Sequence, residues 1–202
     1  MGTAQLYKSF LNEKKQALGK KDKSSKGKID KKIKDLINLI NSNPFLYTTS
    51  SCSGRILIMK EKGKKERKVI LKSWHDKIEV RDLVNFLKKI REKDIIYFKF
   101  EPFILHIISF DYDLAAKIVS LARNIGFKRS GFYYGKRRWA IIEIRGNDIL
   151  AVPIYKNKIL IDEKNLEIII NETNKKIDRN YEKIKKFKEK IKSLLYLNKN
   201  II

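Results

Sequence analysis

Residues 45–59 read FLYTTSSCSGRILIM, two apolar runs separated by a cluster of hydroxyl, thiol, glycine and arginine residues. The apolar and β-branched flanks predict a strand over residues 46–60. A segment that only had to turn the chain would use Gly, Pro, Asn or Asp for their backbone preferences. The polar cluster at residues 48–55 therefore indicates a functional site. The alternative is a Ser/Thr-rich turn whose hydroxyls satisfy local backbone groups.

The rest of the chain alternates between helical and strand patterns. Asp111 is placed to cap one helix, and Gly126 to end it. Pro44 ends another helix, and glycine-containing turns separate the later strands. The patterns predict helices over residues 3–19, 29–42, 80–90 and 112–125, and strands over 67–73, 95–110, 127–134, 138–145 and 148–161.

The last predicted element is one long amphipathic helix over residues 162–199. Apolar residues step by threes and fours, so one face packs and the other carries lysine. A packed helix with a solvated basic face explains this pattern, and so does a basic face that follows a phosphate backbone.

Length and composition predict a single α/β domain. The chain has 202 residues, of which 43% are hydrophobic, enough for one core. We expect a mixed, largely antiparallel sheet flanked by helices, with a basic helical part at 1–45, the sheet and site at 46–161, and the long helix at 162–199. The chain shows no secretory signal and no apolar run long enough to span a bilayer, so a cytoplasmic location is expected.

The single cysteine and the two histidines offer no internal disulfide and no zinc cluster, so no metal is expected. No G-x-G-x-x-G or P-loop pattern occurs either. The sequence therefore gives no sign of a Rossmann-type cofactor site.

Positive charge is the second strong signal, because the formal net charge is +24. Residues 14–34 contain ten lysines against two aspartates, and residues 175–192 contain nine basic residues against three acidic ones. A further basic segment covers residues 60–72. A compositional bias toward lysine is the competing explanation, but concentration in blocks favours a nucleic-acid partner.

Six motifs resemble the wybutosine-synthesis N-4 methyltransferase family, in the same order and over roughly residues 8–195. They are DKSSKGKID at 22–30, TTSSCSGRI at 48–56, Trp74-His75, FKFEPFILHI at 98–107, GFKRSG at 126–131 and NETNKKIDRN at 171–180. The resemblance implies an α/β fold distinct from the Rossmann methyltransferases. It also implies S-adenosylmethionine as cofactor and the anticodon loop of phenylalanine tRNA as partner, methylated at N-4 of 7-(3-amino-3-carboxypropyl)-4-demethylwyosine at position 37. A monomer is expected.

The resemblance also implies the site residues. The catalytic group is Asp22, Ser51, Cys52 and His106, with Gly54 in the same motif as Cys52. The cofactor group is Ser50, Ser51, Arg55, Ser130 and Gly131, and the substrate group is Lys26, Thr48, Arg55, His75 and Glu101.

Chemistry assigns roles within these groups. Asp22 or His106 can accept the displaced proton, and Arg55 suits a carboxylate or phosphate. Since the acceptor is itself a nitrogen, Cys52 has no need to act as a nucleophile and is assigned to packing or orientation. His106 is preferred over His75, because its motif is the tighter match. Tyr47, Trp74, Phe100 and Phe103 are candidates for stacking on the base, with core packing favoured for the two phenylalanines.

Two other functions remain open from the residues alone. A non-enzymatic RNA-binding module would explain the charge but leave the Ser/Cys cluster without a role. A cysteine-dependent hydrolase would pair Cys52 with His106 or His75.

Overall fold

The protein is described from a computed structural model that covers residues 2–19, 30–60, 69–135 and 138–197. The chain divides into two compact units. Unit 1 contains Met1–Ser53, Phe103–Asn147 and Glu182–Ile202, and unit 2 contains Gly54–Pro102 and Asp148–Tyr181. The single-domain organisation expected from the sequence stays a prediction.

Unit 1 is built on a four-stranded antiparallel sheet, called sheet A, with the strand order β1-β5-β7-β6. The strands are β1 (Leu46–Cys52), β5 (Ile104–Ser109), β7 (Ala140–Arg145) and β6 (Gly131–Tyr134). Burial alternates along β7 and along the first four residues of β5. Leu105 and Ile107 of β5 are fully buried, whereas His106 between them is partly exposed. This alternation places the two sets of side chains on opposite faces of sheet A.

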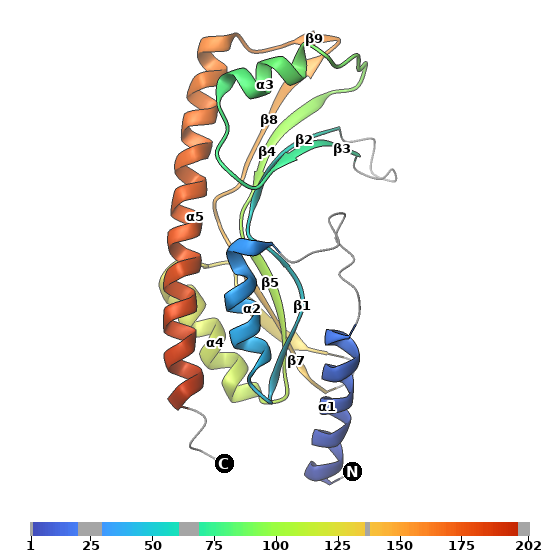
Figure 1. Cartoon of the computed structure of the whole chain (residues 1–202), viewed down its shortest axis with the longest axis vertical. Helices are drawn as coiled ribbons and strands as arrows, with labels where there is room; N and C mark the ends of the chain where they lie inside the picture. Colours follow the sequence, from blue (N-terminus) through green and yellow to red (C-terminus); the bar gives the residue numbers. More distant parts are fainter. Residues whose placement is uncertain (1, 20–29, 61–68, 136–137, 198–202) are drawn as a thin grey trace. The chain divides into compact units, whose positions relative to one another are not determined.

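Helices lie on both faces of sheet A (Figure 1). One face carries α1 (Thr3–Leu18), whose Phe10 is buried with Tyr47, Ile108 and Trp139. The other face carries α2 (Lys34–Asn41) after a 3-10 turn at Lys31–Ile33, α4 (Tyr112–Ile125) and the last part of α5 (Glu163–Leu197).

Partly buried polar contacts fix α1 in place. The Lys14 Nζ donates to the Asn43 carbonyl over 2.6 Å, and the Trp139 Nε1 donates to the Glu13 carboxylate over 3.1 Å. Burial lowers the pKa of Lys14, because removal from water disfavours its charged form.

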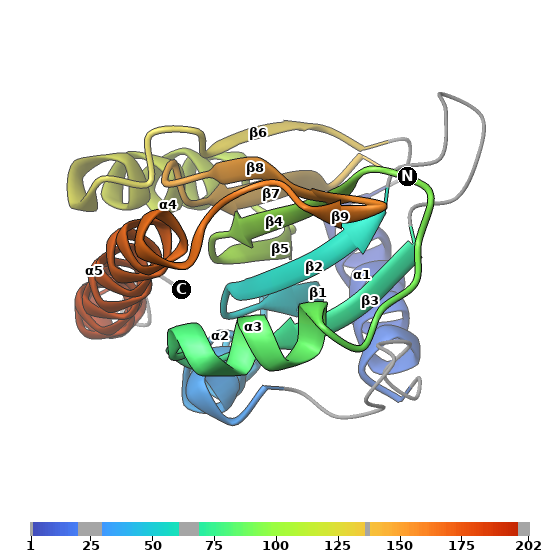
Figure 2. The same cartoon turned by 90° about the horizontal axis from the view of Figure 1, so that it is seen from above.

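Unit 2 is built on a five-stranded antiparallel sheet, called sheet B, with the order β3-β2-β4-β8-β9 (Figure 2). The strands are β2 (Arg55–Lys60), β3 (Val69–Trp74), β4 (Ile96–Glu101), β8 (Leu150–Lys156) and β9 (Lys158–Ile159). The helix α3 (Val80–Leu87) and the first part of α5 pack on this sheet. Leu83 of α3 and Leu166 of α5 join Phe98 of β4 in one buried core.

Most predicted elements are confirmed. The helix at 112–125 begins where Asp111 accepts a hydrogen bond from the Leu114 N–H, at 3.0 Å, and ends at Gly126 with φ +110°. The long helix begins and ends within two residues of its predicted bounds. Among the described residues, every strand pair is antiparallel, and no helix is long and apolar enough to cross a membrane.

Three predicted strands are divided: the run 148–161 becomes β8 and β9 within sheet B, and the other two divisions produce two sheets where one was expected. The run 46–60 becomes β1 and β2, and the run 95–110 becomes β4 and β5. Gly54 has φ +103°, a conformation that L side chains rarely adopt, and ends the first run. Pro102 ends the second because it has no N–H for a ladder.

Candidate functional site

Three side chains from neighbouring strands of sheet A form a hydrogen-bonded chain. The Ser50 Oγ lies 2.7 Å from the His106 Nδ1, and the His106 Nε2 lies 3.0 Å from the Glu143 Oε2. Backbone register produces this arrangement, because Ser50 of β1 is paired with His106 of β5, which is paired with Glu143 of β7. Side chains at paired positions lie on the same face and within contact distance.

The direction of these hydrogen bonds follows from the chemistry of the partners. An ionised carboxylate only accepts, so the Nε2 of His106 carries a proton and donates to Glu143. In the neutral ring the Nδ1 is then an acceptor, and the Ser50 hydroxyl donates to it. The arrangement leaves a basic nitrogen behind a serine hydroxyl, with a carboxylate that stabilises the imidazolium if a proton arrives.

The hydrogen-bonded side chains of Ser50, His106 and Glu143 lie on the face of sheet A that also carries α1. We call this face the site face. Ile108 of β5 is buried under α1, and His106 lies two residues along the same strand. Ser50 is exposed, and the side chains of His106 and Glu143 are 26% and 34% exposed. The three groups are therefore open to a ligand from solvent while being held by the sheet.

Further positions on the site face lie next to this hydrogen-bonded row. Beyond Glu143 the row ends at Gly131 of β6, where a Cβ would meet no atom within 4 Å. Two residues further along the strands, Cys52 of β1 is paired with Ile104 of β5, and Ile104 is paired with the exposed Arg145 of β7. The site face thus offers hydroxyl, imidazole, carboxylate and guanidinium groups beside open space.

Ser51 and Thr48 lie on the opposite side of β1. Ser51 is paired with the buried Leu105, and Thr48 with the buried Ile107. The hydroxyl of Thr48 lies 3.1 Å from the Asn41 Nδ2, and its backbone N–H donates to the Asn41 Oδ1 over 2.8 Å. The structure thus gives Thr48 a contact that joins β1 to α2.

Asp30 connects two of the sequence motifs. Its carboxylate accepts a hydrogen bond from the hydroxyl of the fully buried Ser53 and another from the Lys32 N–H at 3.1 Å. The end of the DKSSKGKID motif is thereby fixed beside the end of β1. Asp22 and Lys26, predicted from the same motif, lie outside the described residues.

Ser130 is 3% exposed and stabilises the start of β6. Its Oγ accepts from the Arg145 backbone N–H at 3.2 Å, and its carbonyl accepts from the Arg123 guanidinium at 3.3 Å. This hydroxyl is already used within the fold.

Arg55 and Glu101 form an ion pair on sheet B. They are paired across β2 and β4, and the Arg55 Nε and Nη2 donate to the Glu101 Oε2 at 3.1 and 3.0 Å. Both side chains are partly exposed, at 32% and 46%. Both residues were predicted from the sequence as site residues, but not as partners of each other.

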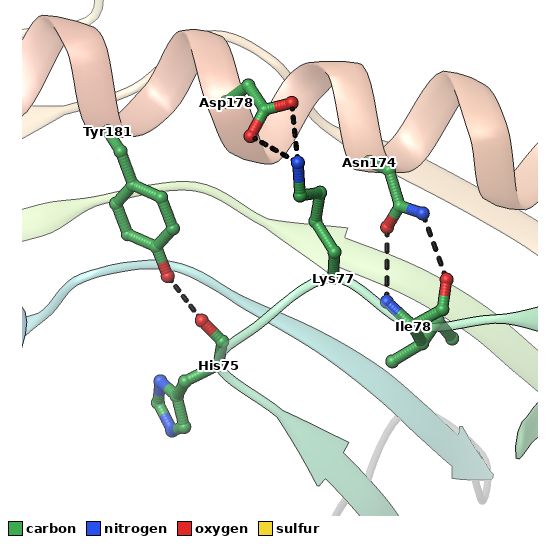
Figure 3. A network of polar contacts seen from close by, with 6 residues as sticks. All are labelled: His75, Lys77, Ile78, Asn174, Asp178 and Tyr181. Carbon is green, nitrogen blue, oxygen red and sulfur yellow. Dashed lines mark hydrogen bonds and ion pairs between the residues drawn. The ribbon is translucent and has the colours of Figure 1, made fainter.

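Helix α5 holds the loop that carries His75 (Figure 3). The Tyr181 hydroxyl donates to the His75 carbonyl, and the Asn174 amide bonds both the N–H and the carbonyl of Ile78, at 3.2 and 2.9 Å. Lys77 forms an ion pair with Asp178 at 3.2 Å. The NETNKKIDRN motif and the Trp74-His75 pair are thus parts of one contact within unit 2.

The predicted stacking aromatics lie mainly in the cores. Tyr47, Phe100 and Phe103 are at most 5% exposed, so none of them presents a free ring face. Trp74 is half-buried against the core of unit 2, with the Lys72 Nζ 5.7 Å from its ring centroid.

Sequence reasoning missed Glu143 and Asp30. Glu143 had a detectable signal, because it is the one acidic residue in the apolar run AIIEI and lies on a strand with strict alternation. Asp30 had none, since its partner Ser53 comes 23 positions later. The roles predicted for individual site residues stay predictions.

Comparison with known proteins identifies the family. Residues 8–193 match the family Methyltransferase TYW3. The "tRNA wybutosine-synthesizing protein 3 homolog" of Danio rerio is 33% identical over 193 residues, which cover 93% of this chain and 76% of that protein. A Thermococcus sibiricus protein named "tRNA(Phe) 7-((3-amino-3-carboxypropyl)-4-demethylwyosine(37)-N(4))-methyltransferase" is 30% identical over 191 residues, 93% of this chain and 96% of that protein.

A solved structure agrees with this match. The PH1069 protein from Pyrococcus horikoshii has a TM-score of 0.85 and 30% identity to this chain, covering 96% of this chain and 100% of its own. The sequence match extends through all the described strands of both sheets and most of α5. This chain therefore belongs to the Methyltransferase TYW3 family.

Proposed function

We propose that the protein is an S-adenosylmethionine-dependent methyltransferase that methylates N-4 of 7-(3-amino-3-carboxypropyl)-4-demethylwyosine at position 37 of tRNA(Phe), as the name of its Thermococcus relative states for that protein. The observation that carries this proposal is the Ser50–His106–Glu143 chain on the site face in a member of this family. The reaction displaces a proton from a ring nitrogen, and the hydrogen-bonded side chains of Ser50, His106 and Glu143 are arranged so that they can accept one.

The groups on the site face fit the cofactor. Ser50 and Arg145 are exposed donors, suited to the carboxylate of an amino-acid tail, and the open space at Gly131 lets a ligand approach the backbone. Separately, on sheet B of unit 2, Glu101 accepts from the Arg55 Nε and Nη2, and among the described residues the Nη1 remains as a donor for a carboxylate or phosphate. When bound, S-adenosylmethionine supplies a methyl group on a sulfonium and leaves as a neutral thioether.

The protein residues handle the proton and the alignment. The Ser50 hydroxyl contacts the N–H of the acceptor base and passes a proton to the His106 Nδ1, while Glu143 stabilises the resulting imidazolium. A sheet fixes this row, so little reorganisation is needed when the reactants bind. Asp22, from the segment that ends at Asp30, remains a second candidate acceptor.

The basic segments supply affinity for the tRNA. Within α5, exposed lysines such as Lys185 and Lys186 are positioned to meet stem phosphates, and the anticodon loop presents an unpaired base at modest cost. A cytoplasmic monomer, as expected from the sequence, is part of this proposal.

The direct test is transfer of a methyl group to the defined base. The protein is incubated with S-adenosylmethionine and tRNA(Phe) that carries the demethylwyosine derivative, and the nucleosides are analysed by mass spectrometry. A gain of one methyl on the tricyclic base is expected, and tRNA(Phe) with an unmodified guanosine at the same position is the control. Absence of the gain would reject the proposal.

Family membership and the register of β1 argue against the two alternatives left open by the sequence. A non-enzymatic RNA-binding module would bind tRNA without binding S-adenosylmethionine, which calorimetry distinguishes. A cysteine-dependent hydrolase that used His106 as its base would need that ring at Cys52, whereas its Nδ1 faces Ser50.

A further inference from the structure

A methyltransferase that acts on a planar base needs a surface on which that base rests. Bases extruded from a nucleic acid are usually held by stacking on aromatic side chains. Of the aromatic candidates, Tyr47, Phe100 and Phe103 are buried and Trp74 is half-buried on sheet B, so a stacking partner on the site face has to be another residue.

Tyr133 of β6 is an aromatic side chain on the site face with a large exposed surface. It is paired with Ile141, which packs against the cluster under α1, and it is 56% exposed. Two residues earlier on the same strand, Gly131 is paired with Glu143. Tyr133 and Glu143 are therefore diagonal neighbours across two strands, with about 7 Å between their Cβ positions.

The spacing of sheet A suits a purine-sized ring. Two strand separations, about 10 Å, lie between β6 and the strand of His106. Gly131 leaves the intervening surface open, because a Cβ there would meet nothing within 4 Å. A ring stacked on Tyr133 thus extends over Gly131 toward the Glu143 and His106 side chains.

Charge on the same face favours a nucleotide as the occupant. Arg145 is exposed on β7, two residues beyond Glu143, and a guanidinium there is suited to a phosphate. Along β7, Arg145 lies four residues from Ile141, the partner of Tyr133, which is about 13 Å at the usual rise of a strand. Aromatic rings and basic groups along one surface are the combination that binds single-stranded nucleic acid.

We propose that Tyr133 is the stacking surface for the base that this enzyme methylates, an unpaired purine-type base of its RNA substrate. This inference rests on the proposed function and names a substrate contact for it. The adenine of the cofactor is a less suitable occupant, since small-molecule sites are concave and bury most of their ligand, whereas Tyr133 is on an edge strand and largely exposed.

The neighbouring tyrosine provides a matched control. Tyr134 is even more exposed, at 77%, but it is paired with Ala140 and points to the opposite face of sheet A. There its ring packs on Tyr112 with 4.8 Å between centroids. Removal of Tyr134 deletes an equally large exposed ring without touching the site face.

The test uses the full chain and an RNA hairpin with the tRNA(Phe) anticodon stem-loop sequence and 2-aminopurine at position 37, a fluorescent base that is quenched by stacking. We expect the wild type and Tyr133→Phe to quench the probe. We expect Tyr133→Ala to lose the quenching and to bind the hairpin roughly 5- to 100-fold more weakly. Tyr134→Ala should behave as the wild type, and calorimetric affinity for S-adenosylhomocysteine should be the same in all four proteins.

Three results would overturn the inference. They are quenching that survives in Tyr133→Ala, equal loss in Tyr134→Ala, and a Tyr133→Ala effect confined to S-adenosylhomocysteine, which would assign the ring to the cofactor. The methyl-transfer assay is separate. If it fails while Tyr133-dependent quenching persists, the proposed function is rejected and the stacking surface stands.

Discussion

Ser50 and Cys52 lie two residues apart on the same face of β1, but Ser50 is the one in register with His106. The bulge between Thr48 and Ser50 decides this, because one extra residue changes which side chains of the strand point to a given face. The imidazole Nδ1 therefore faces a hydroxyl at 2.7 Å. At the scale of single residues, we therefore propose a chemical role for the serine of the motif and none for the cysteine.

Glu143→Gln tests the chain of hydrogen bonds. The amide keeps the size and an acceptor oxygen but loses the negative charge that stabilises an imidazolium. We expect kcat to fall roughly 10- to 100-fold while the Kd for tRNA stays the same, measured by single-turnover methyl transfer and by filter binding. Asp113→Asn, an exposed charge removal on α4, is the control. An unchanged kcat in Glu143→Gln would exclude a part for Glu143 in proton transfer.

Cys52→Ser tests whether the thiol takes part in chemistry. Because the acceptor nitrogen attacks the methyl group itself, we expect kcat/KM within a few-fold of the wild type, whereas Ser50→Ala should lose activity by about the same factor as Glu143→Gln. Both are measured in the same methyl-transfer assay. Loss of all activity in Cys52→Ser would restore the nucleophile hypothesis.

At the scale of elements, α5 is a packed helix that also holds a loop in place. Asn174, Asp178 and Tyr181 are spaced by four and three residues, so they lie on one side of the helix. Through them α5 fixes the backbone from His75 to Ile78 (Figure 3). The presence of Asn174 and Asp178 in the NETNKKIDRN motif is thus explained by contacts within the protein, independently of RNA.

Asn174→Ala should destabilise unit 2. The change leaves the Ile78 N–H and carbonyl without their side-chain partner, which costs about 1–3 kcal/mol if they stay buried. Chemical denaturation followed by circular dichroism measures the loss. Asn171→Ala, one turn earlier and exposed, is the control and should change the free energy of unfolding by less than about 0.5 kcal/mol. Equal effects of the two substitutions would contradict the loop contact.

At the scale of the whole molecule, the net charge of +24 predicts the salt dependence of tRNA binding. Binding to phosphates releases counterions, so the Kd should rise steeply with salt concentration. Lys185→Gln combined with Lys186→Gln removes two exposed charges from α5 and should reduce the slope of log K against log salt by about one to two.

The outcome is read from filter-binding titrations between low and moderate salt. The pair Lys88→Gln and Lys89→Gln, two exposed lysines at the end of α3 outside the basic blocks, is the matched control. A slope that is the same in both double variants would show that the block at 175–192 does not contact phosphates.

Much of the fold could be predicted from local sequence patterns. The helix at 112–125 was predicted with its cap and its end, because Asp111 and Gly126 act within a few residues. The split strands were not, since nothing local indicates that β1 and β5 pair in one sheet while β2 and β4 pair in another. The candidate site shows the same difference between local and long-range information. The motif at 48–55 was identified from its residues, but the partner of His106 was not.

By itself, the sequence determined the periodic elements, the concentration of positive charge and the polar segment between two apolar runs, because these depend on residues close together in the chain. The tertiary structure decided which hydroxyl meets His106, that Glu143 completes the row, and that Arg55 is held by Glu101. Those contacts join strands far apart in sequence, and their register is set by the pairing of whole strands.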